Sequence, residues 1–254
     1  MKLDFTGKVV LITGGTSGIG LAAARMFLAA GASVAVMGRN FEKGQAAVQK
    51  LATVGTSPLF LCGDVTNVCE CERVVRDTCG QFGRLDVLVN SAGEYLEKPI
   101  VDMQEEEFDR ILSVNIKGSY FMSKAAVPEL KRNRGTIVNV SSDAGINGNI
   151  NCTAYCAAKG AVTLFTKALA LELAPYAVRV NCVCPGDIAT PMLERQLALV
   201  DNPAETLLEM ESVYPLGRIG ASDEVAGVIL FLASPAASFV TGAAWSVDGG
   251  LTSV

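Results

Sequence analysis

The sequence predicts a single α/β domain, in which helices cover both faces of a parallel sheet of about seven strands. Short runs of apolar and β-branched residues alternate with longer helical patterns along the whole chain. These runs are apolar on both faces, as strands buried between two helix layers are. No repeat, linker or low-complexity segment interrupts the alternation. Residues 1–254 are therefore expected to form one doubly wound domain.

Seven runs have the length and composition of strands. They are Lys8–Thr13, Ser33–Met37, Leu59–Gly63, Val87–Asn90, Thr136–Val140, Arg179–Cys184 and Ala244–Val247. Helical periodicity fills the intervals between them. The predicted helices are Ile19–Ala30, Phe41–Val54, Val68–Phe82, Glu105–Asn133, Tyr155–Leu173 and Asp223–Ala233. Because a helix stands between successive strands, the strands are expected to run parallel.

The longest irregular stretch, residues 186–220, follows the sixth predicted strand. It contains Pro191, Pro203 and Pro215 with apolar residues between them, Tyr214 among the last. A segment of this length at the carboxyl end of a strand is usually functional in doubly wound domains. We expect it to cover a substrate as a lid.

Net charge and hydropathy exclude several classes of partner. The formal net charge is -5, which disfavours binding to nucleic acid or to an anionic membrane through bulk electrostatics. The early apolar run Val9–Ile12 is far shorter than a signal segment, and no run approaches the roughly 18 apolar residues of a membrane span. A small molecule is the expected partner, and a cytoplasmic location is expected.

The chain has eight cysteines and no histidine. Cys69 and Cys71 lie in a helical pattern that points them to nearly opposite faces. Cys152 and Cys156 have helical spacing, but they would supply only two ligands. No second cysteine pair follows any pair at zinc-site spacing. We expect no metal site and buried free thiols.

A glycine-rich segment, TGGTSGIG, follows the first strand and opens a helix. Glycines in this context let the backbone approach a pyrophosphate, which the helix N-terminus binds through its free amides. The strand before and the helix after the segment are the context that the dinucleotide-binding motif requires. The cofactor contacts expected in this loop are Gly14, Thr16, Ser17, Gly18, Ile19 and Gly20.

The end of the second strand bears on the choice of cofactor. Enzymes that bind NAD usually place an acidic residue there for the ribose hydroxyls, whereas this chain has Gly38 followed by Arg39. Since Arg39 can bind a 2′-phosphate, NADP(H) is favoured, with NAD(H) as the alternative. After the third strand, Asp64 either accepts from an adenine amine or caps the next turn, and Val65 lies beside it.

Six motifs occur in one order: TGGTSGIG, NSAG at Asn90–Gly93, Ser142, YCAAK at Tyr155–Lys159, PGDIAT at Pro185–Thr190, and VDGG at Val247–Gly250. Together they resemble the short-chain dehydrogenase/reductase family over essentially the whole chain. One departure is Ser91, where the family usually has asparagine. The resemblance implies a Rossmann-type fold. It also implies cofactor contacts from Asn90, Ala92, Gly93, Tyr155, Lys159, Pro185, Gly186, Ile188 and Thr190.

Two tyrosine–lysine pairs share one spacing, Tyr120 with Lys124 and Tyr155 with Lys159. The family resemblance implies a serine thirteen residues before the catalytic tyrosine, and counting back from Tyr155 gives Ser142. The resemblance then implies that Tyr155 is the general acid or base and that Lys159 favours its phenolate. Ser142 would hold the substrate oxygen, and Asn115 would anchor a water beside Lys159. Tyr120 is assigned to the core or to a subunit contact.

The resulting hypothesis is an NAD(P)(H)-dependent oxidoreductase that interconverts a ketone and a secondary alcohol. A 3-oxoacyl-[acyl-carrier-protein] reductase is the first alternative, with Lys131, Arg132 and Arg134 as a patch for the acidic carrier. A non-catalytic dinucleotide sensor is the alternative from another class. The resemblance also implies a homotetramer.

Substrate contacts are left open by the sequence. Asn147, Asn149 and Asn151 are suited either to a polar substrate or to loop turns. Glu94, directly after NSAG, either touches the substrate or is an exposed loop residue. Apolar residues of the lid suggest a partly apolar ligand, but lid helices also need such residues for their own packing.

Overall fold

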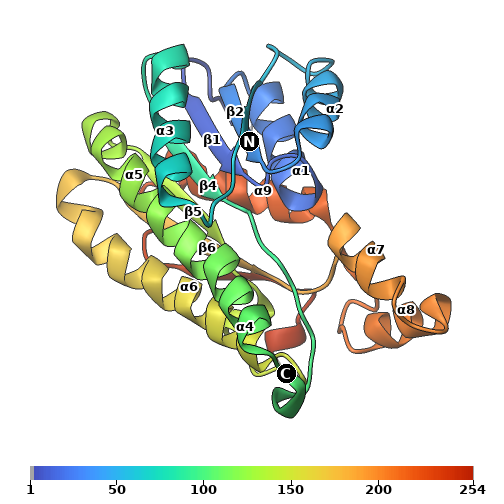
Figure 1. The fold of residues 1–254 in the computed structure, drawn as a ribbon. Helices are drawn as coiled ribbons and strands as arrows, with labels where there is room; N and C mark the ends of the chain where they lie inside the picture. The colour runs from blue at the N-terminus through green and yellow to red at the C-terminus, as the bar shows by residue number, and fades with distance from the viewer. Residues whose placement is uncertain (1–2, 254) are drawn as a thin grey trace.

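The computed structural model describes residues 3–253 and contains a seven-stranded parallel sheet in the order β3-β2-β1-β4-β5-β6-β9 (Figure 1). Its strands are β1 Val9–Thr13, β2 Ser33–Gly38, β3 Leu59–Cys62, β4 Val87–Asn90, β5 Thr136–Val140, β6 Arg179–Pro185 and β9 Ala244–Val247. Each bound agrees with the predicted run to within one residue. The predicted doubly wound α/β fold is confirmed.

Residues of β1 show why this sequence forms a central strand. Val10 and Ile12 enter the core on one face, while Val9 and Leu11 enter the core on the other face. Side chains alternate across a strand, so a strand buried on both faces must be apolar throughout. β1 therefore contributes side chains to the cores on both faces of the sheet.

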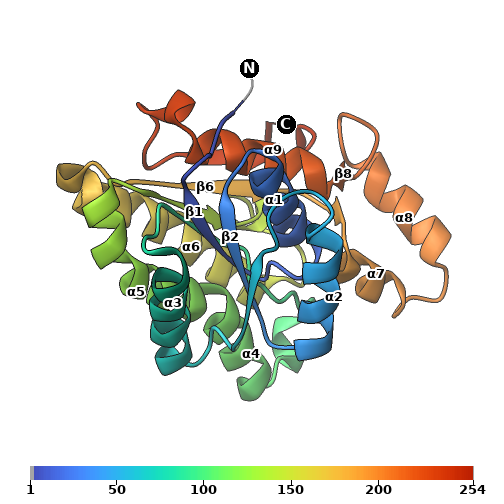
Figure 2. The same cartoon turned by 90° about the horizontal axis from the view of Figure 1, so that it is seen from above.

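Helices cover the two faces of the sheet in separate layers. α1 and α9 pack together on one face with α2 nearby, and α3, α5 and α6 lie on the other (Figures 1 and 2). The helices are α1 Gly18–Ala29, α2 Phe41–Leu51, α3 Val68–Phe82, α4 Glu105–Leu112, α5 Gly118–Asn133, α6 Thr153–Leu173, α7 Pro191–Leu197, α8 Pro203–Ser212 and α9 Ser222–Ala233. Within residues 3–253, no helix combines the length and the apolar character needed to cross a membrane.

The helix predicted over Glu105–Asn133 is continuous in the structure, but a π-helical turn at Ser113–Lys117, which the sequence did not reveal, divides it into α4 and α5. The Asn115 side chain donates to the Ile111 carbonyl at 2.9 Å and to the Glu94 carbonyl at 2.8 Å. A side chain that bonds to the preceding turn competes with regular helical pairing. Such turns occur frequently at functional sites. Apolar periodicity alone cannot reveal one extra residue in a turn.

The segment 186–220, predicted to be irregular, contains the helices α7 and α8. Pro191 and Pro203 each stand in the first helical turn, where proline needs no amide partner. The two ends of the segment pair as short parallel strands, β7 Ile188–Ala189 and β8 Gly220–Ala221. Both views show α7 and α8 set apart from the two helix layers (Figures 1 and 2).

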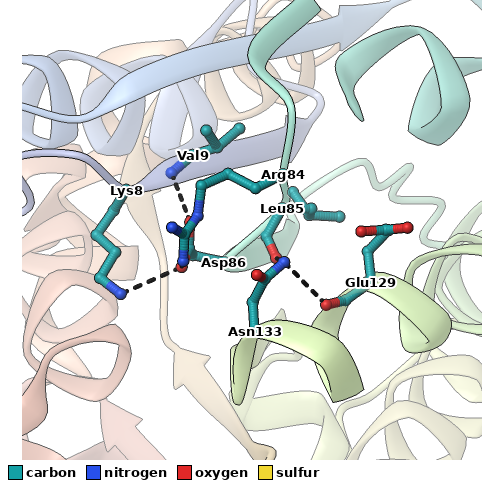
Figure 3. A network of polar contacts seen from close by, with 7 residues as sticks. All are labelled: Lys8, Val9, Arg84, Leu85, Asp86, Glu129 and Asn133. Carbon is teal, nitrogen blue, oxygen red and sulfur yellow. Dashed lines mark hydrogen bonds and ion pairs between the residues drawn. The ribbon is translucent and has the colours of Figure 1, made fainter. Parts of the chain in front are cut away.

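A polar network fixes the amino ends of the central strands (Figure 3). The buried Asp86 carboxylate accepts from the Val9 amide at 3.0 Å and from Arg84 Nε at 2.7 Å. Asn133, at the end of α5, donates to the Leu85 carbonyl at 3.0 Å. These bonds join the start of β1, the start of β4 and the end of α5. They hold the strands whose opposite ends form the site.

All eight cysteines are free thiols, but they are not all buried. Cys62 and Cys69 are exposed, so the prediction of buried thiols is wrong for these two. Cys71 is buried, as expected for the face of α3 opposite Cys69. Within the described residues, no group of three or more His, Cys, Asp or Glu side chains is arranged to hold a metal ion.

Candidate active site

A cleft of about 1140 Å³ lies at the carboxyl ends of the strands. Loops after β1, β2, β3, β4, β5 and β6 line it, together with α7, α8 and part of α6. Chain order reverses direction between β1 and β4, which is where doubly wound sheets bind ligands. The position of the cleft follows from the strand order.

Most of the predicted site residues line this cleft. They are Gly14, Thr16, Ser17, Gly18, Ile19, Arg39, Asp64, Val65, Ala92, Gly93, Ser142, Tyr155, Lys159, Pro185, Gly186, Ile188 and Thr190. Three predicted residues do not line it: Gly20, Asn90 and Asn115. Gly20 lies against the Gly14 carbonyl inside α1, and Asn90 donates to Asn139 Oδ1 at 2.9 Å beneath the cleft.

The glycine-rich loop meets the loop after β4 at the bottom of the cleft. Thr13 Oγ1 accepts from the amides of Ser91 and Ala92, both at 3.1 Å. A Cβ on Gly14 would lie 2.9 Å from the Ala92 backbone, and Gly14 has a φ of +65°. Only glycine suits that position. The loop therefore leaves an open cradle at the N-terminus of α1, which fits a pyrophosphate.

At the end of β2 an acidic side chain would require Thr16 to move. A Cβ on Gly38 would lie 2.9 Å from Thr16 Cγ2. Arg39 is largely exposed, and its Nη1 lies 4.0 Å from Asp64 Oδ2. Asp64 Oδ1 accepts from the Thr66 amide at 2.9 Å, so this residue does cap the turn that follows β3.

Ser142, Tyr155 and Lys159 lie together beside the cleft, with exposed fractions of 7%, 9% and 4%. Ser142 follows β5, while the other two are one turn apart on α6. Lys159 Nζ lies 5.6 Å from the centre of the Tyr155 ring and donates to the Val140 carbonyl at 2.9 Å. The strand end and the helix start thus bring three chemically active groups to one point.

Asn115 reaches the same point from behind the cleft. A Cβ on Gly93 would lie 3.1 Å from Asn115 Oδ1 and 3.6 Å from Lys159 Nζ. Asn115 Oδ1 also accepts from the Glu94 amide at 3.3 Å. The π-helical turn of Asn115 therefore shapes the backbone that borders Lys159.

Burial shifts the pKa values of Tyr155 and Lys159 in opposite directions. It raises the pKa of Tyr155, while the Ser142 hydroxyl acts in the opposite sense. Burial also lowers the pKa of Lys159 to about 8, because a desolvated ammonium is costly. The sequence predicts that Lys159 makes the phenolate easier to form. In the protein itself, desolvation of the phenol is the larger effect.

The other tyrosine–lysine pair has no such surroundings. Tyr120 is 48% exposed, and its ring contacts those of Phe121 and Phe165. Its assignment to the core is wrong, because the ring lies on the outer face of α5. A subunit contact remains a prediction.

Sequence reasoning missed several residues that line the part of the cleft near Tyr155 and the lid. This part is called the substrate half, because the lid is predicted to cover a substrate there. The missed residues are Tyr95, Glu97, Asp143 and Asp187, with Tyr214 known only as an apolar lid residue. Asp143 directly follows Ser142 and Asp187 directly follows Gly186, so adjacency to a motif could have identified both. Tyr95 and Glu97 lie on an irregular segment after β4, where no periodic signal exists.

The sequence left several residues undecided as substrate contacts, and the structure places some of them in the cleft and others outside it. Asn147 and Asn149 line the cleft, whereas Asn151 does not. Glu94 forms an ion pair with Arg110 at 2.9 Å and is not among the cleft residues. Among the apolar lid residues, Leu193 and Met210 line the cleft and Leu208 points to solvent. The lid thus contributes both packing and lining residues.

Comparison with known proteins identifies the family. A family model described as enoyl-(acyl carrier protein) reductase matches residues 14–252. An L-fucose dehydrogenase of Mus musculus is 42% identical over 97% of this chain and 89% of its own length. A cyclopentanol dehydrogenase of Comamonas is also 42% identical, over 96% of this chain and 97% of its own length.

A solved structure agrees with these relatives. A short-chain type dehydrogenase/reductase from Mycobacterium marinum superposes with a TM-score of 0.92 at 36% identity, covering 98% of this chain and 97% of that one. The family model, the two relatives and the solved structure each match nearly the whole chain. The chain belongs to the short-chain dehydrogenase/reductase family of NAD(P)-dependent oxidoreductases.

Proposed function

We propose that Tyr155, Ser142 and Lys159 carry out the interconversion of a secondary alcohol and a ketone in this cleft. The observation that supports this most directly is the burial of the three side chains together at the junction of β5 and α6. A phenol with an ordinary pKa of about 10 needs a special environment to exchange protons near neutral pH. Burial by itself raises the pKa of Tyr155, so the buried Lys159 ammonium one turn away has the role of offsetting that desolvation during the reaction.

In the proposed reaction, each residue of the site has a separate role. A bound nicotinamide cofactor supplies the hydride for reduction or accepts it in oxidation. Tyr155 gives its phenolic proton to the carbonyl oxygen during reduction and takes the hydroxyl proton during oxidation. Ser142 Oγ donates to Asp143 Oδ1 in the structure and would turn to the same substrate oxygen to hold it in place. Lys159 stabilises the phenolate and binds the ribose hydroxyls, and Asn115 keeps the backbone beside Lys159 in position.

NADP(H) is the cofactor that we favour over NAD(H). Gly38 offers no carboxylate, and the close approach of Thr16 blocks one from being added without rearrangement. Arg39 is exposed at the cleft edge, with a guanidinium suited to a 2′-phosphate. Its loose contact with Asp64 is one that a phosphate would replace.

Residues 186–220 act as the substrate lid in this proposal. α7 and α8 stand apart from the helix layers and line the outer wall of the cleft (Figure 1). Thr190, at the start of the lid, lies next to the cofactor loop, since a Cβ on Gly18 would be 3.2 Å from Thr190 Cγ2. Closure of the lid would therefore accompany occupation of the nucleotide end.

We also propose that the protein is a homotetramer and that it is located in the cytoplasm. Large apolar side chains are exposed on α5, α6 and the C-terminal segment, including Tyr120, Leu164, Leu171 and Trp245. Self-association would cover them. Free thiols throughout the chain suit a reducing compartment. Light scattering of the purified protein measures the number of subunits.

Reduction of 3-oxoacyl groups on a carrier protein has less support. Lys131 lies over the Tyr176 ring at 3.6 Å, and Arg132 pairs with Glu129 at 2.9 Å. Both cations are therefore engaged on their own surface. A non-catalytic sensor would not need Ser142, Tyr155 and Lys159 to converge.

A cofactor-dependent substrate screen tests the proposal. The intact protein is mixed with NADP⁺ or NAD⁺ and a panel of secondary alcohols, and reduced cofactor is followed at its absorbance band. We expect turnover of at least one class, with deuterium transferred directly from a labelled CH–OH carbon to the cofactor. Tight NADPH binding without turnover of any alcohol or ketone would favour the sensor.

A further inference from the structure

Three carboxylates lie around Tyr155 in the substrate half of the cleft. Asp143 follows Ser142, Asp187 follows Gly186, and Glu97 lies on the segment after β4; all three line the cleft. Glu97 accepts from the Tyr95 hydroxyl at 3.0 Å. The Tyr95 ring packs edge-on against the Tyr155 ring, with 5.0 Å between the ring centres. These acids therefore border the place where the substrate oxygen must lie.

Hydroxyl and amide groups, rather than cations, hold these carboxylates. Ser142 Oγ donates to Asp143 Oδ1 at 2.7 Å, and Asn149 Nδ2 donates to Asp143 Oδ2 at 2.9 Å. The Tyr214 hydroxyl donates to Asp187 Oδ2 at 2.8 Å. Over residues 3–253, neither Glu97, Asp143 nor Asp187 forms an ion pair.

Two oxygens remain available as acceptors. Glu97 Oε1 and Asp187 Oδ1 receive no hydrogen bond from the described part of the chain, although the other oxygen of each carboxylate does. Asp187 is partly buried at the base of the lid, so a ligand that closes this space removes water from it. A carboxylate oxygen that has lost water and receives no hydrogen bond raises the free energy of the complex. The substrate must then bring donors of its own.

Charge in this half of the cleft disfavours an anion. Burial raises the pKa of Asp187, and the nearby Asp143 and Glu97 carboxylates raise it further. The cations that line this half are Lys159, which is buried beneath Tyr155, and Arg195, on the exposed face of α7. An anionic substrate bound beside Tyr155 would therefore lie among three carboxylates, with Lys159 as the buried cation nearby.

We propose that this cleft selects a neutral, polyhydroxylated substrate of the sugar or cyclitol type, whose hydroxyls donate to Glu97 and Asp187. The inference rests on the proposed function and adds the substrate class to it. Hydroxyl groups both donate and accept, which matches the mixture of carboxylates with the Tyr95 and Tyr214 hydroxyls. A plain secondary alcohol would reach Tyr155 and leave Asp187 Oδ1 without a donor, while the exposed Glu97 would stay hydrated. Sites built to bond a substrate hydroxyl reject analogues that lack it, by up to about 10⁴-fold.

The experiment compares four kinds of substrate with the intact protein and NADP⁺. L-fucose, D-glucose and myo-inositol are the neutral probes, D-glucuronate is the anion, D-glucosamine is the cation, and cyclopentanol is the plain alcohol. We expect kcat/KM for the best neutral polyol to exceed that for each other class by at least about 100-fold. Preference for glucuronate, glucosamine or cyclopentanol would overturn the proposal.

Substitution of the acceptors tests the residues themselves. Asp187→Asn and Glu97→Gln should each lower the ratio of polyol to cyclopentanol kcat/KM by about tenfold or more, mainly through the polyol KM. Asp201→Asn makes the same chemical change on the lid outside the cleft and should leave the ratio unchanged. Equal losses for polyol and cyclopentanol in the first two variants would mean a merely structural role.

A binding measurement separates this proposal from the proposed function. The Tyr155→Phe variant with NADP⁺ is titrated with the polyols and cyclopentanol by calorimetry. Polyol binding that weakens with added Asp187→Asn supports the acceptor role even if no substrate is turned over. Turnover with no preference for polyols over cyclopentanol, in rate and in binding, would overturn the substrate class while leaving the oxidoreductase function intact.

Discussion

The Lys159 ammonium is 4% exposed and donates a 2.9 Å hydrogen bond to the Val140 carbonyl at the end of β5. The end of β5 thus holds the ammonium on which the proposed role of Tyr155 depends. One carbonyl bond does not replace the lost water, which is why burial lowers the pKa of Lys159 to about 8. The catalytic arrangement is therefore expected to cost stability.

Lys159→Met tests that cost. The folded pKa lies below the ordinary value of 10.5, so the unfolded chain binds more protons between about pH 8 and 10.5, and wild-type stability rises with pH across that window. We expect the variant to unfold with about 2 kcal/mol more free energy than wild type at pH 7, and with much less advantage at pH 10. Urea titrations at both pH values measure the difference.

Lys124→Met is the matched control for that experiment. Lys124 occupies the same place in the other tyrosine–lysine pair but lies exposed on α5. Its removal should change the free energy of unfolding by less than about 0.5 kcal/mol at either pH. An advantage of Lys159→Met that stays constant from pH 7 to pH 10 would contradict a lowered pKa.

The two tyrosines should differ sharply in their effect on rate. Tyr155→Phe removes the proton donor and acceptor, so kcat is expected to fall by at least about 100-fold. Tyr120→Phe removes a hydroxyl on the outer face of α5 and should stay within about twofold of wild type. Steady-state kinetics with the best substrate of the screen decide the matter, and equal losses would refute the assignment of Tyr155.

Arg39→Asp tests the preference for NADP(H). Loss of charge-assisted bonds to a 2′-phosphate, together with the new negative charge, should raise the KM for NADPH at least about tenfold. The KM for NADH should change less than about threefold. Arg76→Asp, an equal change of charge on the exposed face of α3, serves as the control. A cofactor ratio that stays the same in Arg39→Asp would rule out the phosphate contact.

Asp86→Asn tests the network at the amino ends of the strands (Figure 3). The change weakens the bonds that the buried carboxylate accepts from Val9 and Arg84, so we expect a loss of about 2 kcal/mol in the free energy of unfolding. Asp77→Asn weakens only partly exposed ion pairs with Arg73 and Arg76 and should cost less than about 0.5 kcal/mol. Equal costs in the two variants would show that burial of Asp86 is unimportant.

Much of this protein follows from its sequence. The strand bounds are recovered within one residue, because a strand buried on both faces has to be apolar along its length. The glycine-rich loop is recognisable because Gly14 has a backbone requirement that few other residues meet. Ser142, Tyr155 and Lys159 were predicted from the family resemblance, and they lie together because the end of β5 and the start of α6 are close along the chain.

Tertiary structure alone decided the rest. The π-helical turn at Asn115 depends on bonds to Glu94, a residue of another loop, and the meeting of Asp187 with Tyr214 joins positions 27 residues apart. Tyr95 reaches Tyr155 only because β4 and β5 are neighbours in the sheet. Local sequence patterns reflect the backbone conformation and the burial of a single segment. Which side chains then line the cleft depends on strand order and on packing between segments. The sequence alone therefore predicted the proposed reaction centre, and the fold determined its surroundings.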